Sequence, residues 1–371
     1  METMMKFTLP NYSAPNFSKE GLANAPNVRF EPAPADFVAP DEYHATTIFP
    51  EYYKVDGQWL LPKRNRMDCV AILENGEIFV REFRHIKRGD KIAVGRTEDG
   101  SDGIYVHPNC FTEAASEAEE AKETFAFRQG RSRETAFSID YDFLYELLRH
   151  ERDNGYIVWV MGPACSFDAD SRKAFTTLIE KGYVNALLGG NALATHDLEG
   201  AYKSTALGQD IYTQAIMPNG HYNHIDTINR ARYHGSIEKF IEAEGIDNGI
   251  VYTCVKRNIP LVLAGSIRDD GPLPGVYADA YQGQDAMRVE LSKATTIIAM
   301  ASTLHTIAAG NISPMYFMTD DNQIRPVYFY TVDISEFSAN KLADRGSLSA
   351  KSIITNAQDF VVHLGKVLGE D

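Results

Sequence analysis

The sequence predicts an α/β protein, with a doubly wound, mostly parallel sheet preceded by a small β-rich domain. Beyond Tyr156, nearly continuous apolar runs alternate with helical patterns, as expected of parallel strands that are covered on both faces. Between Asp41 and Asn109, shorter β-prone runs are separated by turn signals, which is the pattern of hairpins. A chain of 371 residues also exceeds what one hydrophobic core usually holds, so we expect two domains.

The first part of the chain predicts an arm and then a β-domain. Residues 1–40 are rich in Pro, Asn and Ser, and EPAPADFVAP cannot hold helix or ladder hydrogen bonds for long, so we expect an extended arm. Residues 41–115 are assigned to the β-rich domain, with turns at Asp56-Gly57, Asn75-Gly76 and Arg88-Gly89-Asp90. Its predicted strands are HATTIF, YYKV, QWLL, DCVAIL, EIFVREF and KIAVG.

The second part predicts a connector and the larger domain. Residues 116–150 contain AASEAEEAKETF, a strong helix former, and a polar Gly-containing stretch, so we assign them to a helical connector. Residues 151–371 form the α/β domain, whose predicted strands are YIVWVMG, VNALLGG, IPLVLAGS, TTIIAMAS and PVYFYTVDI. Several of these runs end directly in Gly, Ser, Asn or Asp. Because open α/β sheets bind ligands outside the carboxyl ends of their strands, we predict a ligand site there.

The composition excludes some classes of partner. A formal net charge of −15 argues against a nucleic-acid surface, which needs clustered Lys and Arg. Four cysteines lie far apart without a CxxC pair, which indicates reduced structural thiols. No apolar run approaches the roughly 18 residues of a membrane span, and the N-terminus has neither a basic start nor a continuous apolar stretch. We therefore expect a cytoplasmic protein with no membrane partner.

Two strand-to-helix turns are candidate phosphate or nucleotide sites. MGPACSFDADSR carries Ser166, Asp168 and Ser171 and matches neither a Walker loop nor GxGxxG, so it is either a phosphate turn or an ordinary capped turn. In LGGNALATHD, Asn191 either caps the following helix or hydrogen-bonds a nucleotide.

Charged groups follow three further predicted strands. Asp269 and Asp270 are adjacent carboxylates, and one of them could act as a proton acceptor. Arg268 could hold a substrate carboxylate. The alternative is that an Arg–Asp pair only stiffens the loop. His305 follows TTIIAMA and has either a structural or a proton-transfer role. Asp333 and Asp344 could bind ribose hydroxyls or belong to a salt-bridged helix start.

The histidine-rich tract NGHYNHID raises the question of a metal. Its spacing matches neither HExxH nor a Cys/His zinc pattern, so we expect no metal site. His221, His224 and His234 fit a polar helix start or a subunit contact better.

Five longer stretches occur in one order from about residue 33 to the C-terminus. They are PADFVAPDEYHATTIFPEYYKVDGQWLLPKRNRMDCVAIL, LLGGNALATHDLEG, NGHYNHIDTINRAR, VLAGSIRDDGPLPGV and VDISEFSANKLADRGS. Together they resemble the LOR/SDH family, whose characterised members include archaeal-type ornithine cyclodeaminases. The resemblance implies a β-domain, an NAD-binding domain similar to that of deoxyhypusine synthase, and a homo-oligomer, either a dimer or a tetramer. Family members usually carry an additional α+β segment ahead of the β-domain, and the resemblance begins without it.

The same resemblance implies conversion of L-ornithine to L-proline and ammonia by tightly bound NAD. A hydride would pass from the α-carbon to the nicotinamide, the side-chain amine would attack the imine, ammonia would leave, and the hydride would return. Carried over to matching positions, the cofactor contacts would be Asn191, Ala192, Asp270, Ser302, Thr303, Asp344 and Arg345, to which we add Asp333. For proton transfer we predict Asp269, Lys256 and His305, and for the substrate carboxylate Arg268 or Arg66.

Two other functions stay open. An NAD-dependent oxidoreductase or aminoalkyl transferase could act on another amino acid or a polyamine. Aminoalkyl transfer uses a lysine to hold an imine, so borohydride would trap an adduct on Lys256 or Lys341. A non-catalytic NAD-binding protein would bind the nucleotide without releasing proline from ornithine.

Overall fold

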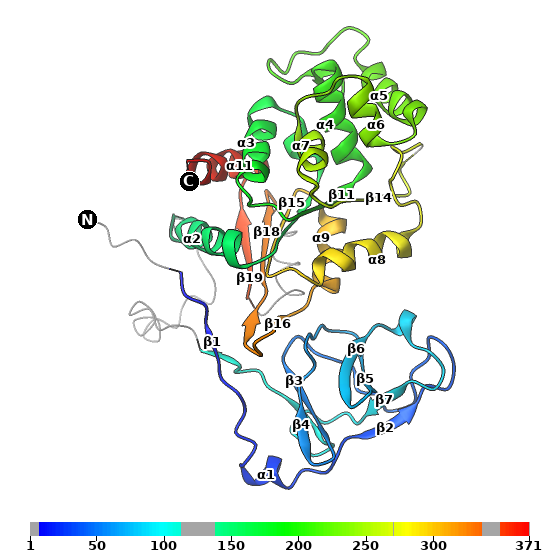
Figure 1. The fold of residues 1–371 in the computed structure, drawn as a ribbon, viewed down its shortest axis with the longest axis vertical. Helices are drawn as coiled ribbons and strands as arrows, with labels where there is room; N and C mark the ends of the chain where they lie inside the picture. Colours follow the sequence, from blue (N-terminus) through cyan, green and yellow to red (C-terminus); the bar gives the residue numbers. More distant parts are fainter. Residues whose placement is uncertain (1–6, 113–137, 270, 336–348, 371) are drawn as a thin grey trace, which may run out of the picture.

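The computed structural model describes residues 7–112, 138–269, 271–335 and 349–370. Figure 1 shows a larger part in which helices flank a central sheet, and a smaller β-rich part beneath it. The described residues 7–112 contribute the β-rich part, and residues from 138 onward contribute the larger part.

The larger part is built on a six-stranded sheet in which every neighbouring pair of strands is parallel. Its strands, in spatial order, are β14 (Leu261–Ala264), β11 (Ala186–Gly190), β10 (Ile157–Met161), β15 (Thr296–Met300), β18 (Tyr328–Asp333) and β19 (Ser349–Ile354). Numbered along the chain, this is the order 3-2-1-4-5-6 of the Rossmann fold, whose strand order reverses between β10 and β15. The predicted fold class is confirmed.

Both faces of this sheet are buried, because side chains of the central strands alternate between two apolar clusters. Trp159 and Met161 of β10 belong to one cluster, and Val158 and Val160 belong to the other. The first cluster is completed by α2 (Ser138–Asn154), α3 (Ala169–Glu180), α7 (Ile250–Arg257) and α11 (Ala357–Leu368). The second is completed by α8 (Ala280–Leu291) and α9 (Thr303–Ile312). Helices on both faces make the sheet doubly wound.

Three further helices cover the end of the sheet near β11 and β14. They are α4 (Asn191–Lys203), α5 (His221–His234) and α6 (Ile237–Ala243), which share a third apolar cluster with α7. The short hairpin of β12 (Thr205–Ala206) and β13 (Gln209–Asp210) connects α4 to α5.

The smaller part contains two antiparallel sheets. One has the order β2 (Arg29–Pro32), β7 (Lys91–Val94), β5 (Val70–Glu74) and β6 (Glu77–Arg81); the other has the order β4 (Gln58–Leu60), β3 (Glu51–Val55) and β8 (Ile104–Val106). Asp56-Gly57 and Asn75-Gly76 both have positive φ at the two turn positions, as two-residue hairpin turns require. The hairpins predicted at these pairs are confirmed.

Several elements differ from the predictions. HATTIF (residues 44–49) forms one isolated bridge, at Ala45, rather than a strand. Residues Arg29–Pro32 of the predicted arm pair with β7, so this part of the arm is incorporated in the β-domain. β8 and β19 were not predicted, and α2 packs against the larger sheet although its sequence fell in the predicted connector. The predicted helix AASEAEEAKETF (residues 114–125) lies outside the described residues.

Short elements join the two parts. β16 (Tyr316–Met318) and β17 (Ile324–Pro326) form a hairpin, and the Tyr316 hydroxyl donates to the Pro62 carbonyl (2.5 Å). The N–H of Met315 donates to the Asn65 carbonyl (2.8 Å). The remaining elements are β1 (Asn11–Tyr12), α1 (Glu20–Ala23), η1 (Phe83–His85), β9 (Phe111–Thr112) and η2 (Pro163–Ser166).

Two other predictions concern thiols and membranes. All four cysteines are buried and unpaired, as predicted for structural thiols. Among the helices of the described ranges, none combines the length and the hydropathy that crossing a bilayer requires.

Candidate functional site

The carboxyl edge of the large sheet brings four strand ends together. β14, β11, β10 and β15 are consecutive parallel neighbours, so the residues that follow Ala264, Gly190, Met161 and Met300 lie along one edge. The reversal of strand order between β10 and β15 lies within this row. Ligands of open α/β sheets bind at such a reversal.

At the reversal, two chain segments approach too closely for a side chain. The N–H of Gly162 donates to the Met300 carbonyl (2.9 Å), and a Cβ on Gly162 would lie 1.8 Å from the Ala301 carbonyl oxygen. Ala301 has φ 53°, in the left-handed region that costs an L-residue roughly 1–2 kcal/mol. Backbone strain of this kind is frequent at functional sites, where the surrounding structure maintains it.

The N-terminus of α3, which follows the first strand, is already occupied by a carboxylate. Asp168 is its N-cap, and Asp168 Oδ1 accepts hydrogen bonds from the N–H groups of Asp170 (3.0 Å) and Ser171 (2.9 Å). Asp170 adds a second carboxylate to the first turn. A phosphate would meet two negative charges there, so the capped-turn alternative for MGPACSFDADSR holds.

The N-termini of α4 and α9, by contrast, are open. Neither helix has a side-chain cap hydrogen bond or an acidic residue in its first turn. Each begins directly after a strand of the same edge, α4 at Asn191 and α9 at Thr303. Unpaired N–H groups and the positive end of the helix dipole make such positions suitable for phosphate oxygens.

His305 connects three of the strand ends. Its Nδ1 lies 2.9 Å from Ser302 Oγ, and its ring also hydrogen-bonds the Ala264 carbonyl. A Cβ on Gly190 would lie 3.1 Å from His305 Cε1, so the glycine leaves room for the ring. Since a carbonyl only accepts, the ring nitrogen facing Ala264 carries the hydrogen, and Nδ1 of the neutral ring accepts from Ser302.

Burial keeps this histidine neutral. Desolvation lowers the pKa of His305 below its ordinary value of 6.5, although the hydrogen bond with Ala264 and the charge of Asp269 oppose the shift. The ring is therefore uncharged at neutral pH and can accept a proton through the Ser302 hydroxyl.

The loop after β14 places Asp269 beside this group. Asp269 Oδ2 accepts from the N–H of Ser266 (2.8 Å), which folds the loop back on itself. Arg268 is exposed and forms no ion pair within the described ranges. Among the described residues, the loop is stiffened by the contact of Asp269 with Ser266, and Arg268 forms no ion pair with Asp269.

Asn191 is the first residue of α4 and not its cap. Its Oδ1 accepts from the N–H of Leu273 (2.9 Å) and from Thr195 Oγ1 (3.3 Å). Asn191 thereby holds the loop after β14 against the end of β11.

The structure brings some predicted residues together and separates others. Asn191, Ala192, Asp269, Ser302, Thr303, His305 and Asp333 lie at the carboxyl edge, Asp333 as the last residue of β18 beside β15. Lys256 is exposed near the C-terminal end of α7, on the side where β14 begins. Asp270, Lys341, Asp344 and Arg345 lie outside the described residues.

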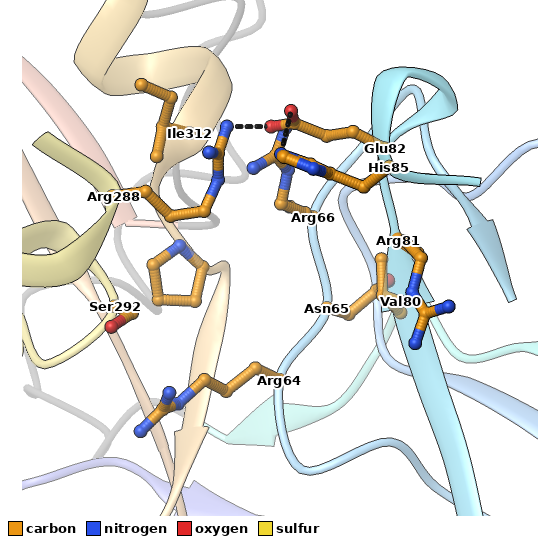
Figure 2. Close-up of a pocket in the computed structure, with 11 residues that line it drawn as sticks. Arg64, Asn65, Arg66, Val80, Arg81, Glu82, His85, Arg288, Ser292 and Ile312 are labelled. Atoms are coloured by element: carbon orange, nitrogen blue, oxygen red, sulfur yellow. Dashed lines mark hydrogen bonds and ion pairs between the residues drawn. The ribbon is translucent and has the colours of Figure 1, made fainter. Parts of the chain in front are cut away.

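Arg66 also lies away from this edge. It lines a cavity between the two domains, where its guanidinium contacts Glu82 (Figure 2). Within one chain it is therefore not grouped with Arg268.

Sequence reasoning missed the positions that act through backbone geometry. In the sequence, the close approach of Gly162 to Ala301 is indicated only by the Gly-Pro pair that follows the strand. The contact between Asn191 and Leu273 joins residues far apart in the chain, so local sequence patterns do not predict it. No group of three metal-ligating side chains occurs in the portions of the chain that the structure describes.

Comparison with known proteins identifies close relatives. Residues 143–364 match the family model "Arginine dihydrolase ArgZ-like, C-terminal, Rossmann fold". The ornithine cyclodeaminase of Methanococcus maripaludis is 34% identical over 358 residues, which cover 93% of this chain and 81% of the relative. A crystal structure of a conserved LOR/SDH protein from the same organism superposes with a TM-score of 0.82 at 32% identity, covering 93% of this chain and 99% of that one.

A second type of relative is longer. AgrE of Nostoc sp., a bifunctional arginine dihydrolase/ornithine cyclodeaminase, is 34% identical over 342 residues, which cover 90% of this chain and 46% of AgrE. A crystal structure of AgrE in a ternary complex with ornithine and NAD+ superposes with a TM-score of 0.58 at 33% identity, covering 94% of this chain and 47% of that one.

Proposed function

The chain belongs to the ornithine cyclodeaminase family, and from this premise we propose that it converts L-ornithine to L-proline and ammonia with bound NAD. The observation that carries the proposal is the pair of uncapped helix N-termini, α4 and α9, at the strand-order reversal of a Rossmann sheet. The ternary complex of AgrE with ornithine and NAD+ supports the same substrate and cofactor.

The residues at this edge fit a dinucleotide. The open helix ends offer N–H donors without a competing carboxylate, and the glycine at position 162 allows the ends of β10 and β15 to lie close together beside them. We propose that NAD is held by the residues that the family resemblance indicated, which are Asn191, Ala192, Asp270, Ser302, Thr303, Asp333, Asp344 and Arg345. When bound, NAD would supply redox chemistry: a hydride acceptor for the substrate α-carbon and a hydride donor for the cyclic imine, which becomes proline.

The protein's own residues orient the substrate and move protons. We propose that the Ser302 hydroxyl passes a substrate proton to His305 Nδ1, because the two atoms are 2.9 Å apart and the ring is neutral. Asp269 would stabilise the protonated ring by its charge. The exposed guanidinium of Arg268 would hold the substrate carboxylate in a bidentate pair.

The proposal is tested on the purified full chain. We expect it to carry NAD or bind it on addition, and to release ammonia and proline in equal amounts from L-ornithine. Bound NAD with no proline would leave the chain as a nucleotide-binding protein, and no NAD binding would overturn the proposal entirely.

A borohydride test addresses the aminoalkyl-transfer alternative. The exposed position of Lys256, away from the carboxyl edge, argues against a covalent imine on that residue. We expect no trapped adduct after reduction with ornithine, and a trapped lysine would favour the transferase.

Two further proposals concern location and assembly. The four buried, unpaired cysteines support the predicted cytoplasmic location. The predicted dimer or tetramer is supported by apolar side chains that lie exposed around α5 and the β12–β13 hairpin, namely Tyr212, Ile216 and Tyr233. Light scattering on the purified chain gives the mass that decides this point.

A further inference from the structure

The cavity that Arg66 lines lies between the two domains, at the edge of the large sheet opposite the proposed nucleotide site. It measures about 330 Å³ and is lined from the β-domain by Arg64, Asn65, Arg66 and Glu82 (Figure 2). Arg288, Ser292, Ile312 and Pro314 line it from the larger domain. These four belong to the C-terminal ends of α8 and α9, whereas the proposed nucleotide site lies at the opposite ends of the neighbouring strands. The cavity is therefore separate from the proposed active site.

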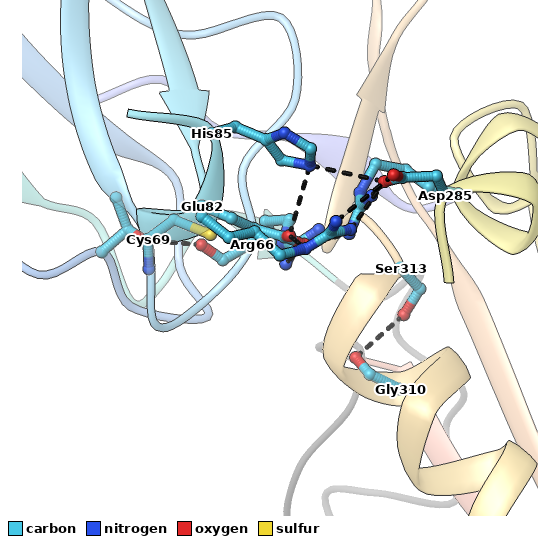
Figure 3. Close-up of polar contacts among 10 residues, drawn as sticks. Arg66, Cys69, Glu82, His85, Asp285, Gly310 and Ser313 are labelled. Atoms are coloured by element: carbon cyan, nitrogen blue, oxygen red, sulfur yellow. Dashed lines mark hydrogen bonds and ion pairs between the residues drawn. The ribbon is translucent and has the colours of Figure 1, made fainter. Parts of the chain in front are cut away.

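Guanidinium groups are concentrated around this cavity, in a chain whose formal net charge is −15. Four of the eleven lining residues are arginines. Arg66, Arg84 and Arg288 all contact the Glu82 carboxylate, and Arg84 and Arg288 also contact Asp285, at 2.6 and 2.5 Å. Figure 3 shows this network spanning the gap between the domains.

The Glu82 carboxylate is fully ionised within the network. Burial would raise its pKa, but the charges of Arg66, Arg288 and Arg84 outweigh this effect and hold the pKa of Glu82 below its ordinary value. Two carboxylates, Glu82 and Asp285, share three guanidiniums, which leaves one positive charge for another anion.

Several polar atoms at the cavity lack partners. Nε of Arg66 and Nε of Arg288 are buried without a hydrogen bond. Arg64 contacts the Phe317 ring but no carboxylate in the parts of the chain that are described. Buried donors without partners are costly, so the two Nε groups favour binding of an oxyanion, and the exposed guanidinium of Arg64 adds a further positive charge beside the cavity.

Asn65 supplies an unpartnered acceptor at the same place. Its side chain is fully buried, and its Nδ2 donates to the carbonyls of Thr47 (3.1 Å) and Phe49 (2.5 Å). These two carbonyls fix the orientation of the amide, because a flipped amide would place oxygen against oxygen. Its Oδ1 has no hydrogen-bond partner. A ligand with a donor group would satisfy it.

We propose that this interdomain cavity binds a free α-amino acid, whose carboxylate pairs with Arg64 and Arg66 and whose ammonium group donates to Asn65 Oδ1 near Glu82. A zwitterion satisfies both the unpaired donors and the unpaired acceptor. A phosphate would satisfy only the donors and would face the Glu82 charge. The volume lies at the lower end of the range for small-molecule sites, which suits a ligand of amino-acid size. Side chains of both domains line the cavity, so the bound amino acid lies between them.

The test measures binding to the full chain saturated with NAD. Calorimetric titrations use L-alanine, L-glutamate, L-arginine and L-proline, with inorganic phosphate as a separate arm. We expect at least one amino acid to bind. Its amide lacks the carboxylate and its N-acetyl derivative lacks the ammonium group, so each should bind at least about 10-fold more weakly. Arg64→Gln should weaken binding of the amino acid by a similar factor. When no other amino acid is added, the variant should turn over ornithine at the wild-type rate.

Matched variants separate the site from general effects. Arg96→Gln removes an exposed arginine that pairs with Glu42 on the same domain, and we expect wild-type binding. Ser292→Leu fills the cavity from α8 and should abolish binding even if Arg64→Gln proves unstable. The proposal is overturned if no amino acid of the panel binds at about 10 mM, if the cavity variants bind as the wild type does, or if phosphate binds as tightly as the amino acid.

Discussion

Replacing Gly162 with alanine tests whether the close approach at the strand-order reversal is required for nucleotide binding. The new Cβ would lie 1.8 Å from the Ala301 carbonyl oxygen and 2.6 Å from its carbon, whereas ordinary contact begins near 3.4 Å. The obstacle is backbone, so a side-chain rotation cannot relieve it. The ends of β10 and β15 would have to part by roughly 1.6 Å, which breaks the hydrogen bond from Gly162 to Met300.

Two quantities should change in Gly162→Ala. Overpacking of this kind destabilises by about 1–3 kcal/mol, so the melting temperature should fall. A displacement of more than ~1 Å at the reacting edge should also weaken NAD binding and reduce ornithine turnover, the latter by about 100-fold. Thermal melts and fluorescence titration with NAD measure both effects.

Matched substitutions make the outcome specific. Gly21→Ala adds a Cβ that meets nothing within 4 Å and should behave as the wild type. Ala301→Gly removes the positive-φ strain of residue 301 and should preserve or raise stability. If Gly162→Ala kept the wild-type melting temperature and NAD affinity, the close approach would not matter and the reasoning would fail.

Three other substitutions test separate parts of the site and fold. In the wild type, kcat/KM should decline as the pH falls below about 6.5, because burial lowers the pKa of His305 and the ring becomes protonated only there. His305→Gln should lose about 100-fold of activity and should no longer show this decline at acidic pH. If the pH profile of the variant matched that of the wild type, His305 would not be the proton acceptor. Arg172→Met should lower the free energy of unfolding in urea by about 3–5 kcal/mol, because it leaves the fully buried Asp197 carboxylate without the guanidinium that lies 2.9 Å away. As a control, Arg29→Met removes an exposed ion pair and should change the free energy of unfolding by less than about 1 kcal/mol. Asp168→Ala removes the N-cap of α3 and should lower the free energy of unfolding by about 1 kcal/mol, but it should leave NAD affinity unchanged. A marked loss of NAD affinity would instead indicate that the N-terminus of α3 binds the phosphates.

The fold was predictable where local pattern and burial agree. Apolar runs such as YIVWVMG and TTIIAMAS became β10 and β15 because both of their faces are covered. Asn75-Gly76 became a hairpin turn because only such residues accept positive φ easily. HATTIF has the β propensity of a strand but forms only an isolated bridge at Ala45, since the pairing of a strand depends on neighbours that propensity does not describe.

The site was predictable in its location and not in its details. Polar residues after parallel strands correctly placed Asn191, Ser302 and His305 at one edge. The sequence could not decide that Asp168 caps α3 while α4 and α9 stay uncapped, because each alternative fits the same residue types. Arg268 or Arg66 was predicted at the substrate carboxylate; the contact of Arg66 with Glu82 between the domains depends on tertiary packing and could not be predicted from the sequence.

A crystal structure of the chain with NAD tests the central claim most directly. We predict that pyrophosphate oxygens lie within hydrogen-bond distance of backbone N–H groups in the first turn of α4 or α9, with the Asp168 cap of α3 intact. A pyrophosphate bound at the N-terminus of α3, or a nucleotide located in the cavity between the domains, would contradict the account.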